Sequence, residues 1–208
     1  MIVSQKSTNF PLHRDDVWSD TGEHMIPLGY MMKRVMKRPD WLKQPKVEDI
    51  FSVSRCMSKD FCDWIGEWKH NVYYNGYWFF NSPRIIRDIA SRRGIVLDDM
   101  TLFYYEGQEN QYNADTRQWE PFAPVPDFPL CVEPPSHKIL HGYDVATYYV
   151  NSSAECSPLS CNGLAEDIPT NAHCLLDDFQ TAKTLLETGA FENSEPGPYR
   201  IIAVYTLT

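Results

Sequence analysis

One short segment, CSPLSCNGLAEDIPTNAHC, concentrates the side chains that most readily do chemistry. It runs from Cys156 to Cys174 and contains three of the six cysteines and one of the six histidines. Thiolate and imidazole groups bind zinc, and a thiol beside an imidazole can act as a nucleophile. The segment is therefore a candidate metal site or catalytic site. Otherwise its cysteines pack as small apolar residues or form a disulfide.

A zinc site would need four ligands, usually in pairs separated by about two to four residues. Cys156 and Cys161 have four residues between them, at the edge of that range. A third ligand would come from the end of the segment, and the carboxylate of Asp167 could complete the site. The candidate metal ligands are Cys156, Cys161, His173 and Cys174.

A catalytic cysteine needs a thiol of lowered pKa beside a base, and the base needs an orienting partner. Cys161, His173 and Asp167 supply these residue types, with Asn162 as another orienting group. No glycine-flanked nucleophile turn accompanies Cys161, so the signature is incomplete. An enzyme that uses this segment is therefore the alternative hypothesis for the chain.

The rest of the sequence carries no complete catalytic or nucleotide-binding signature. GxGxxG, GxxxxGK[ST], HExxH and GxSxG are all absent. We therefore expect no cofactor and no metal.

The elements that position the segment follow from a similarity between the two halves of the chain. NGYWFFNSPRIIRDIA begins at Asn75 and NAHCLLDDFQTAKTLL begins at Asn171. Each has a short apolar run, then a helix N-cap candidate, Asn81 or Asp177, and then apolar residues at helical spacing. With Gly94 and Gly189 as helix stops, the pattern predicts helices over 82–93 and 178–189.

Strands are expected on both sides of these features. β-branched and aromatic residues predict strands over 49–53 and 144–148, and again near 100–106 and 199–207. The fold class expected is α+β, with two tandem similar β-β-α-β units and an N-terminal helical extension in one compact protein. The four parts are the extension 1–37, a first unit 38–106, a polar and Pro-rich connection 107–132, and an acidic second unit 133–208.

Two further helices are predicted from apolar spacing. The first lies in HMIPLGYMMKRVMKR, where Leu28, Met31, Met32, Val35 and Met36 recur at helical intervals, and we expect it to pack on the core. The second lies in SKDFCDWIGEWKH, over 58–70. In the repeat, Cys174 corresponds to Trp78, so we expect Cys174 to be a buried apolar residue.

Charge is distributed unevenly. Residues 1–117 contain 16 acidic and 16 basic residues, which leaves 28 − 16 = 12 acidic and 19 − 16 = 3 basic residues in 118–208. An acidic surface repels nucleic acid and attracts basic proteins. No apolar run reaches the roughly 18 residues of a membrane span, and the polar start lacks a signal-peptide core. We therefore expect a cytoplasmic protein with reduced cysteines and no membrane or nucleic-acid partner.

These observations favour a non-enzymatic protein-binding module. Its concrete form is an immunity-type inhibitor, which binds a toxin enzyme and occludes it through an acidic surface. Carboxylates would steer the basic partner and aromatic residues would anchor it. The candidate contacts cluster around the loop and the helix start of the second unit, at Glu155, Glu166, Asp167, Asp177 and Asp178.

Overall fold

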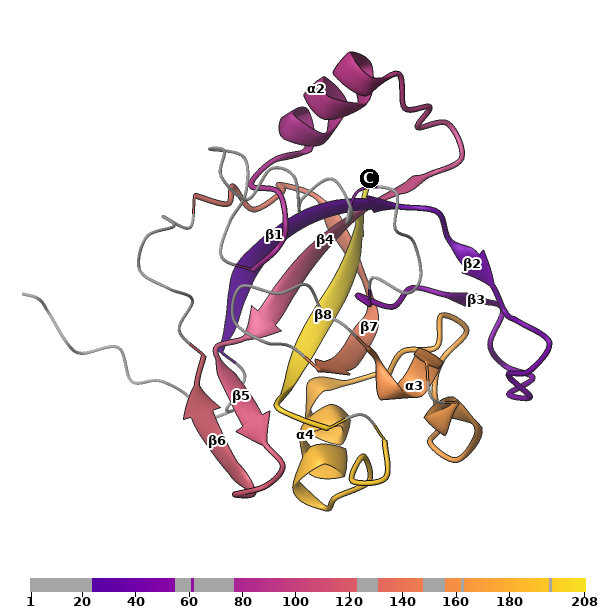
Figure 1. Ribbon diagram of the computed structural model, residues 1–208, viewed down its shortest axis with the longest axis vertical. Helices are drawn as coiled ribbons and strands as arrows, with labels where there is room; N and C mark the ends of the chain where they lie inside the picture. The colour runs from indigo at the N-terminus through magenta and orange to yellow at the C-terminus, as the bar shows by residue number, and fades with distance from the viewer. Residues whose placement is uncertain are drawn as a thin grey trace, which may run out of the picture.

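The computed structural model describes residues 24–54, 61, 77–122, 131–147, 156–161, 163–194 and 196–208. Within them lies a six-stranded antiparallel sheet, so the fold is α+β as predicted (Figure 1). Its path is β1-β4-β8-β5-β6, and β7 pairs with β8 from the other side. The strand bounds are Met25–Lys33 for β1, Thr101–Gln108 for β4, Asn110–Asn113 for β5, Gln118–Pro121 for β6, Lys138–Thr147 for β7 and Tyr199–Leu207 for β8.

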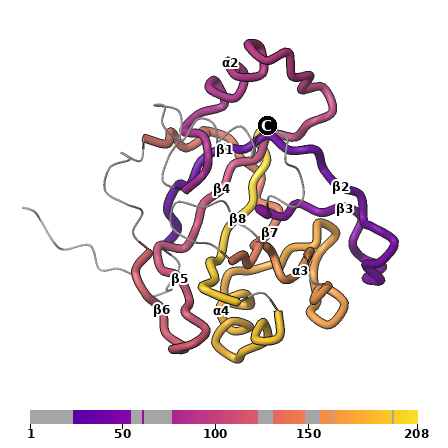
Figure 2. Tube along the Cα trace, in the orientation of Figure 1, coloured from indigo at the N-terminus to yellow at the C-terminus, as the bar shows by residue number. Residues whose placement is uncertain are grey.

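The C-terminal strand β8 forms the centre of the sheet, between β4 and β7 (Figure 2). Its residues from Ile201 to Val204 are fully buried, with alternate side chains in two separate apolar clusters. A strand covered on both faces is expected to contain a continuous apolar run, and β8 contains IIAVY. The predicted strands near 100–106 and 199–207 are therefore confirmed as β4 and β8.

Both predicted helices are present, as α2 (Pro83–Arg93) and α4 (Phe179–Glu187), towards opposite ends of the molecule (Figure 1). α2 stops at Gly94, which has a φ of 67°, and α4 is followed by Gly189, with a φ of 79°. The predicted N-caps are each one residue too early. The caps are Ser82 and Asp178, because the chain is still extended there.

The predicted N-terminal amphipathic helix is wrong where the chain is described, because residues 25–33 form strand β1. From Leu28 to Lys33 every residue of the strand is buried, so both of its faces are covered. β1 pairs with β4 along one edge, and Tyr30 bridges to Phe80 on the other. A strand that is buried on both faces lacks the two-residue alternation of apolar and polar residues. Its apolar residues can therefore also fall at helical intervals. Residues 1–23 and all of the predicted 58–70 helix except Phe61 lie outside the described residues.

The first half is organised differently from the predicted β-β-α-β unit. The strand expected over 49–53 is limited to β3 (Asp49–Ile50), which pairs with β2 (Met36–Lys37) in a separate two-stranded sheet. The strand beside β4 is instead β1, which precedes residue 38. The connection 107–132 contains the β5–β6 hairpin, which joins β8 through Tyr112 and Tyr199.

The two halves nevertheless share local features. In each half, a long strand at the edge of the sheet contains a bulge and forms an isolated β-bridge to a residue just before a helix. A second long strand follows that helix. Two non-glycine residues before the helices have positive φ, at 64° and 60°. The corresponding residues are Gly29 and Gly142 at the bulges, Trp78 and Cys174 at positive φ, and Phe80 and Leu176 at the bridges.

Two short helical elements, α3 (Pro158–Cys161) and η1 (Leu164–Glu166), complete the described structure. Within this part of the chain, no helix has the length and apolar character needed to cross a membrane.

Candidate functional site

The segment 156–174 meets the β2–β3 hairpin, residues 36–50, through its backbone. Glu48 N and Asp49 N both donate to Ala172 O, at 2.8 and 3.2 Å, and Phe51 N donates to His173 O at 3.1 Å. These bonds place the hairpin against the turn 171–175. The tertiary structure therefore surrounds His173 with residues from a distant part of the sequence.

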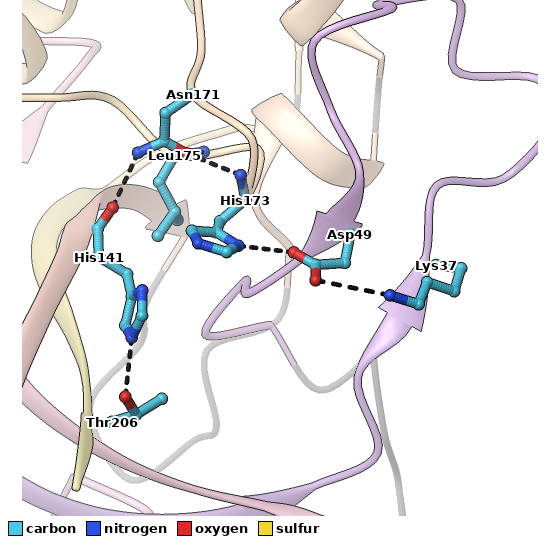
Figure 3. A network of polar contacts seen from close by, with 7 residues as sticks. All are labelled: Lys37, Asp49, His141, Asn171, His173, Leu175 and Thr206. Carbon is cyan, nitrogen blue, oxygen red and sulfur yellow. Dashed lines mark hydrogen bonds and ion pairs between the residues drawn. The ribbon is translucent and has the colours of Figure 1, made fainter. Parts of the chain in front are cut away.

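Asn171 shapes this turn with its side-chain amide (Figure 3). Its Oδ1 accepts hydrogen bonds from the backbone N of His173 and of Leu175, at 2.9 and 3.2 Å, while its Nδ2 donates to His141 O at 2.8 Å. An asparagine that bonds to the backbone two residues ahead stabilises a tight turn. The turn is thereby attached to β7, and the His173 side chain points to Asp49.

Two imidazoles, one carboxylate and one phenyl ring form what we call the histidine cluster: His141, His173, Asp49 and Phe51. His173 Nδ1 lies 2.6 Å from Asp49 Oδ1, and His141 Nε2 lies 2.8 Å from Thr206 Oγ1 (Figure 3). The Phe51 ring stacks on His173 with centroids 4.1 Å apart. The two imidazoles are edge-to-face at 4.9 Å.

The electrostatics of the cluster are set by partial burial. Burial lowers the pKa of His141, the neighbouring His173 lowers it further, and Asp49 acts in the opposite direction. His141 is therefore neutral at neutral pH. The second Asp49 oxygen lies 3.9 Å from Lys37 Nζ, on a side chain that is 83% exposed. Such a group of imidazoles and a carboxylate can bind and release protons.

A second polar network is buried at the ends of β1 and β7. Asp144 accepts hydrogen bonds from Ser52 Oγ, Val53 N and Ser157 Oγ, at 2.8, 2.8 and 2.6 Å. Lys33 Nζ donates to three successive carbonyls, those of Ser52, Val53 and Ser54. Both charged residues are buried, and burial raises the pKa of Asp144. They hold the chain after β3 in the core.

The cysteines of the segment differ in burial. Cys174 is 1% exposed, as predicted, and burial raises the pKa of its thiol to about 12. Cys161 Sγ lies 3.6 Å from Ser54 Oγ. All four described cysteines, Cys131, Cys156, Cys161 and Cys174, carry thiols, while Cys56 and Cys62 lie outside the described residues.

The proposed ligands and catalytic residues are brought together only in part. His173 bonds to Asp49, a carboxylate 124 residues away, rather than to the expected Asp167, which is exposed. Among the residues with described positions, no group of three or more His, Cys, Asp or Glu side chains could hold a metal ion.

The candidate partner contacts lie on two elements. Glu166 and Asp167 end η1, and Asp177 and Asp178 precede α4; all four are exposed, whereas Glu155 lies outside the described residues. Two have structural roles as well. Glu166 Oε1 accepts from Lys43 N at 2.9 Å, and Asp178 Oδ1 accepts from Thr181 N at 2.7 Å. The bonds to Thr181 lower the pKa of Asp178.

Sequence reasoning missed an exposed tryptophan on a loop that bonds to one of these carboxylates, Glu166. Trp41 is 51% exposed, and its ring lies 3.7 Å from the position that a Cβ on Gly163 would occupy. Its loop is held to η1 by the bond from Lys43 N to Glu166 and by Gln44 Nε2, which donates to Ala165 O at 3.1 Å. We call Trp41, Glu166 and Asp167 the Trp41 surface.

The hairpin side of this surface has mixed charge, with four exposed basic residues and the exposed Asp40 and Glu48. Lys37, Arg38, Lys43 and Lys46 are all exposed there. A separate cavity of about 710 Å³ lies between the β5–β6 turn and the loop before β8, where Arg117 forms an ion pair with Glu192 at 2.6 Å. None of the predicted site residues lines it.

No protein-family model matches the chain, and comparisons with curated proteins and with solved structures found no significant match.

Proposed function

We propose that the chain is a non-enzymatic protein-binding module of the cytoplasm, whose partner is a basic protein. An immunity-type inhibitor that occludes a toxin enzyme is the concrete form of this function. The observation that carries the proposal is the Trp41 surface, where a half-exposed tryptophan lies on a loop that bonds to the exposed Glu166, and the exposed Asp167 follows Glu166 in the chain.

Tryptophan is among the residues that most often supply a large share of binding energy at protein interfaces. Trp41 lies near Gly163, and the two residues that follow Leu42 in its loop, Lys43 and Gln44, are hydrogen-bonded to η1. Binding through a group that is already ordered loses less conformational entropy. Trp41 is therefore suited to be the anchor.

The charges around the anchor supply selectivity. Glu166 and Asp167 would face basic residues of the partner. The lysines and arginine of the hairpin would repel basic residues of a partner that docks in another position. Asp177 and Asp178 extend the acidic character towards α4. A partner with one basic patch, rather than a uniformly basic surface, matches this arrangement.

The two halves of the chain, in this proposal, are copies of one structural unit. Support comes from the shared bulges, bridges and positive φ angles, and from the order of strand, helix and strand. The acidic second copy would then be the one specialised for binding, with the first-half hairpin contributing Trp41.

A second candidate function is an enzyme that uses the 156–174 segment. The observation that favours it is the 2.6 Å contact between His173 Nδ1 and Asp49. A carboxylate that holds one imidazole nitrogen leaves the other available as a proton acceptor, with Cys161 as the candidate nucleophile.

The test begins with capture of the partner from the native host, followed by association kinetics with the purified pair. The double variant Glu166→Gln and Asp167→Asn keeps side-chain shape, and the amide oxygen introduced at position 166 can still accept from Lys43 N. We expect the association rate to fall about tenfold at low salt, and the difference to shrink as salt screens the charges. Trp41→Ala should mainly speed dissociation.

The matched control is Asp88→Asn with Asp98→Asn, which removes two exposed charges near α2. It should leave the association rate nearly unchanged. If the two double variants behave alike across the salt series, the carboxylates of the Trp41 surface do not steer the partner and the proposal fails.

A further inference from the structure

The histidine cluster lies in the contact between the β2–β3 hairpin and the 171–175 turn. The Trp41 surface does not include it, yet the cluster holds the hairpin that carries Trp41. The polar and aromatic contacts to His173 across this junction are the Asp49–His173 bond and the stacking of Phe51 on His173, at 2.6 and 4.1 Å. They supplement three backbone bonds between the two segments.

The cluster has two imidazoles but only one carboxylate. Asp49 is bonded to His173 and lies 3.9 Å from Lys37, so it already faces two potential cations. His141, on β7, packs its ring edge against both Phe51 and His173, and its Nε2 contacts the neutral hydroxyl of Thr206. A positive charge on His141 would therefore have no carboxylate of its own among these neighbours.

We propose that the histidine cluster is a proton-sensitive clasp, which holds the β2–β3 hairpin against the 171–175 turn when His141 is neutral and releases it when His141 is protonated. Release separates the rings of Phe51 and His173 from His141 and admits water to the imidazolium. The hairpin then loses the contacts of Asp49 and Phe51 at the turn, while its Leu42, Val47 and Ile50 side chains stay in the apolar cluster around α4.

The direction of the pH dependence follows from linkage. Burial and His173 lower the pKa of His141 in the closed state relative to an exposed imidazole, which titrates near about 6.5. The open state therefore binds the proton more readily. The stabilisation of the closed hairpin is fully present above about pH 6.5 and declines as the pH falls below it.

One consequence of the clasp rests on the proposed function: binding through Trp41 would weaken in acid. The clasp itself does not depend on that function. Opening of the hairpin itself can be measured without any partner. A failed clasp experiment would thus leave the binding proposal standing, and a failed binding experiment would leave the clasp standing.

Hydrogen exchange followed by NMR on the full chain tests the clasp. The relevant amides are those of Glu48, Asp49 and Phe51, which bond across the junction, with the Ile202 and Val204 amides of β8 as the core reference. After correction for intrinsic exchange, the opening constant of the junction amides should rise about tenfold between about pH 7.5 and about pH 5.5, while that of the core changes little.

His141→Phe keeps an aromatic ring against Phe51 but cannot take up the proton, so the rise in junction opening should disappear. The control His24→Gln removes an exposed histidine that pairs with Glu109, and it should leave the rise intact. A rise that persists in His141→Phe would overturn the clasp, and so would one shared equally by β8.

An imidazole NMR titration of the unsubstituted protein keeps the test valid even if the variant fails to fold. His141 should titrate below an exposed imidazole, and the opening of the junction amides should rise between about pH 6.5 and the pH at which His141 titrates. If His141 titrates at or above about 6.5, or at a pH unrelated to junction opening, the clasp is refuted.

Discussion

Individual charged residues in this protein have roles that their exposure decides. Lys33 and Asp144 are buried and fully engaged with backbone and hydroxyl groups, whereas Glu166 and Asp167 are exposed and available for a partner. Burial of a charge is favourable only when hydrogen bonds replace the lost water. The first pair therefore belongs to the fold, and the second belongs to the proposed function.

Asp144→Ala should strongly destabilise the protein. The substitution leaves two serine hydroxyls and Val53 N–H without their acceptor and removes a negative charge near the buried Lys33 ammonium. Loss of one member of a buried charged network costs about 3–5 kcal/mol. Urea unfolding at neutral pH measures the loss, and Asp144→Asn, which keeps an acceptor oxygen, should lose less. A cost below about 1 kcal/mol would show that the network contributes little.

At the scale of elements, close backbone approaches determine where the strands bend. β7 has a bulge between Leu140 and Gly142, and Tyr143 then bridges to Leu176. A Cβ on Gly142 would lie 2.6 Å from Leu176 O and 2.9 Å from Asn171 Nδ2. The bulge thus brings β7 against the very turn that carries His173.

Gly142→Ala should therefore cost far more than Gly94→Ala. Both glycines have positive φ, at 142° and 67°, but nothing lies within 4 Å of a Cβ on Gly94. We expect about 1 kcal/mol for Gly94→Ala, from left-handed backbone strain alone. The clash at Gly142 adds a displaced backbone, which we expect to bring its cost to about 3 kcal/mol or more. Thermal unfolding measures the stability that each variant loses. Equal losses would mean that the backbone at the bulge shifts at little cost in free energy.

At the scale of the whole molecule, the four described cysteines range from exposed to buried. Cys174 is buried in the apolar cluster around α4, and Cys131 is exposed. This distribution agrees with cysteines that serve as small apolar residues and surface residues.

Denatured, unreduced protein should titrate close to its six thiols. Native protein should react more slowly, because Cys174 is almost inaccessible and burial raises its thiol pKa to about 12. Elemental analysis should find less than one zinc per chain. A tightly held stoichiometric zinc would instead establish the metal hypothesis, with ligands drawn in part from residues outside the described ranges.

The α+β class, both main helices, the two central strands and the burial of Cys174 could be predicted from the sequence by itself. Each depends on local patterns, such as the apolar stripe before Gly94 or the apolar run IIAVY in the last strand, which act through neighbouring residues. Charge distribution likewise directed attention to Glu166 and Asp167, and both proved to be exposed.

Only the tertiary structure decided what surrounds those residues. β1 could not be distinguished from a helix, because burial on both faces removes the two-residue alternation of a strand. The pairing of His173 with Asp49, and the position of Trp41 against Gly163, join segments more than a hundred residues apart. Such contacts depend on how the hairpin packs against the 171–175 turn, and no local pattern encodes that packing.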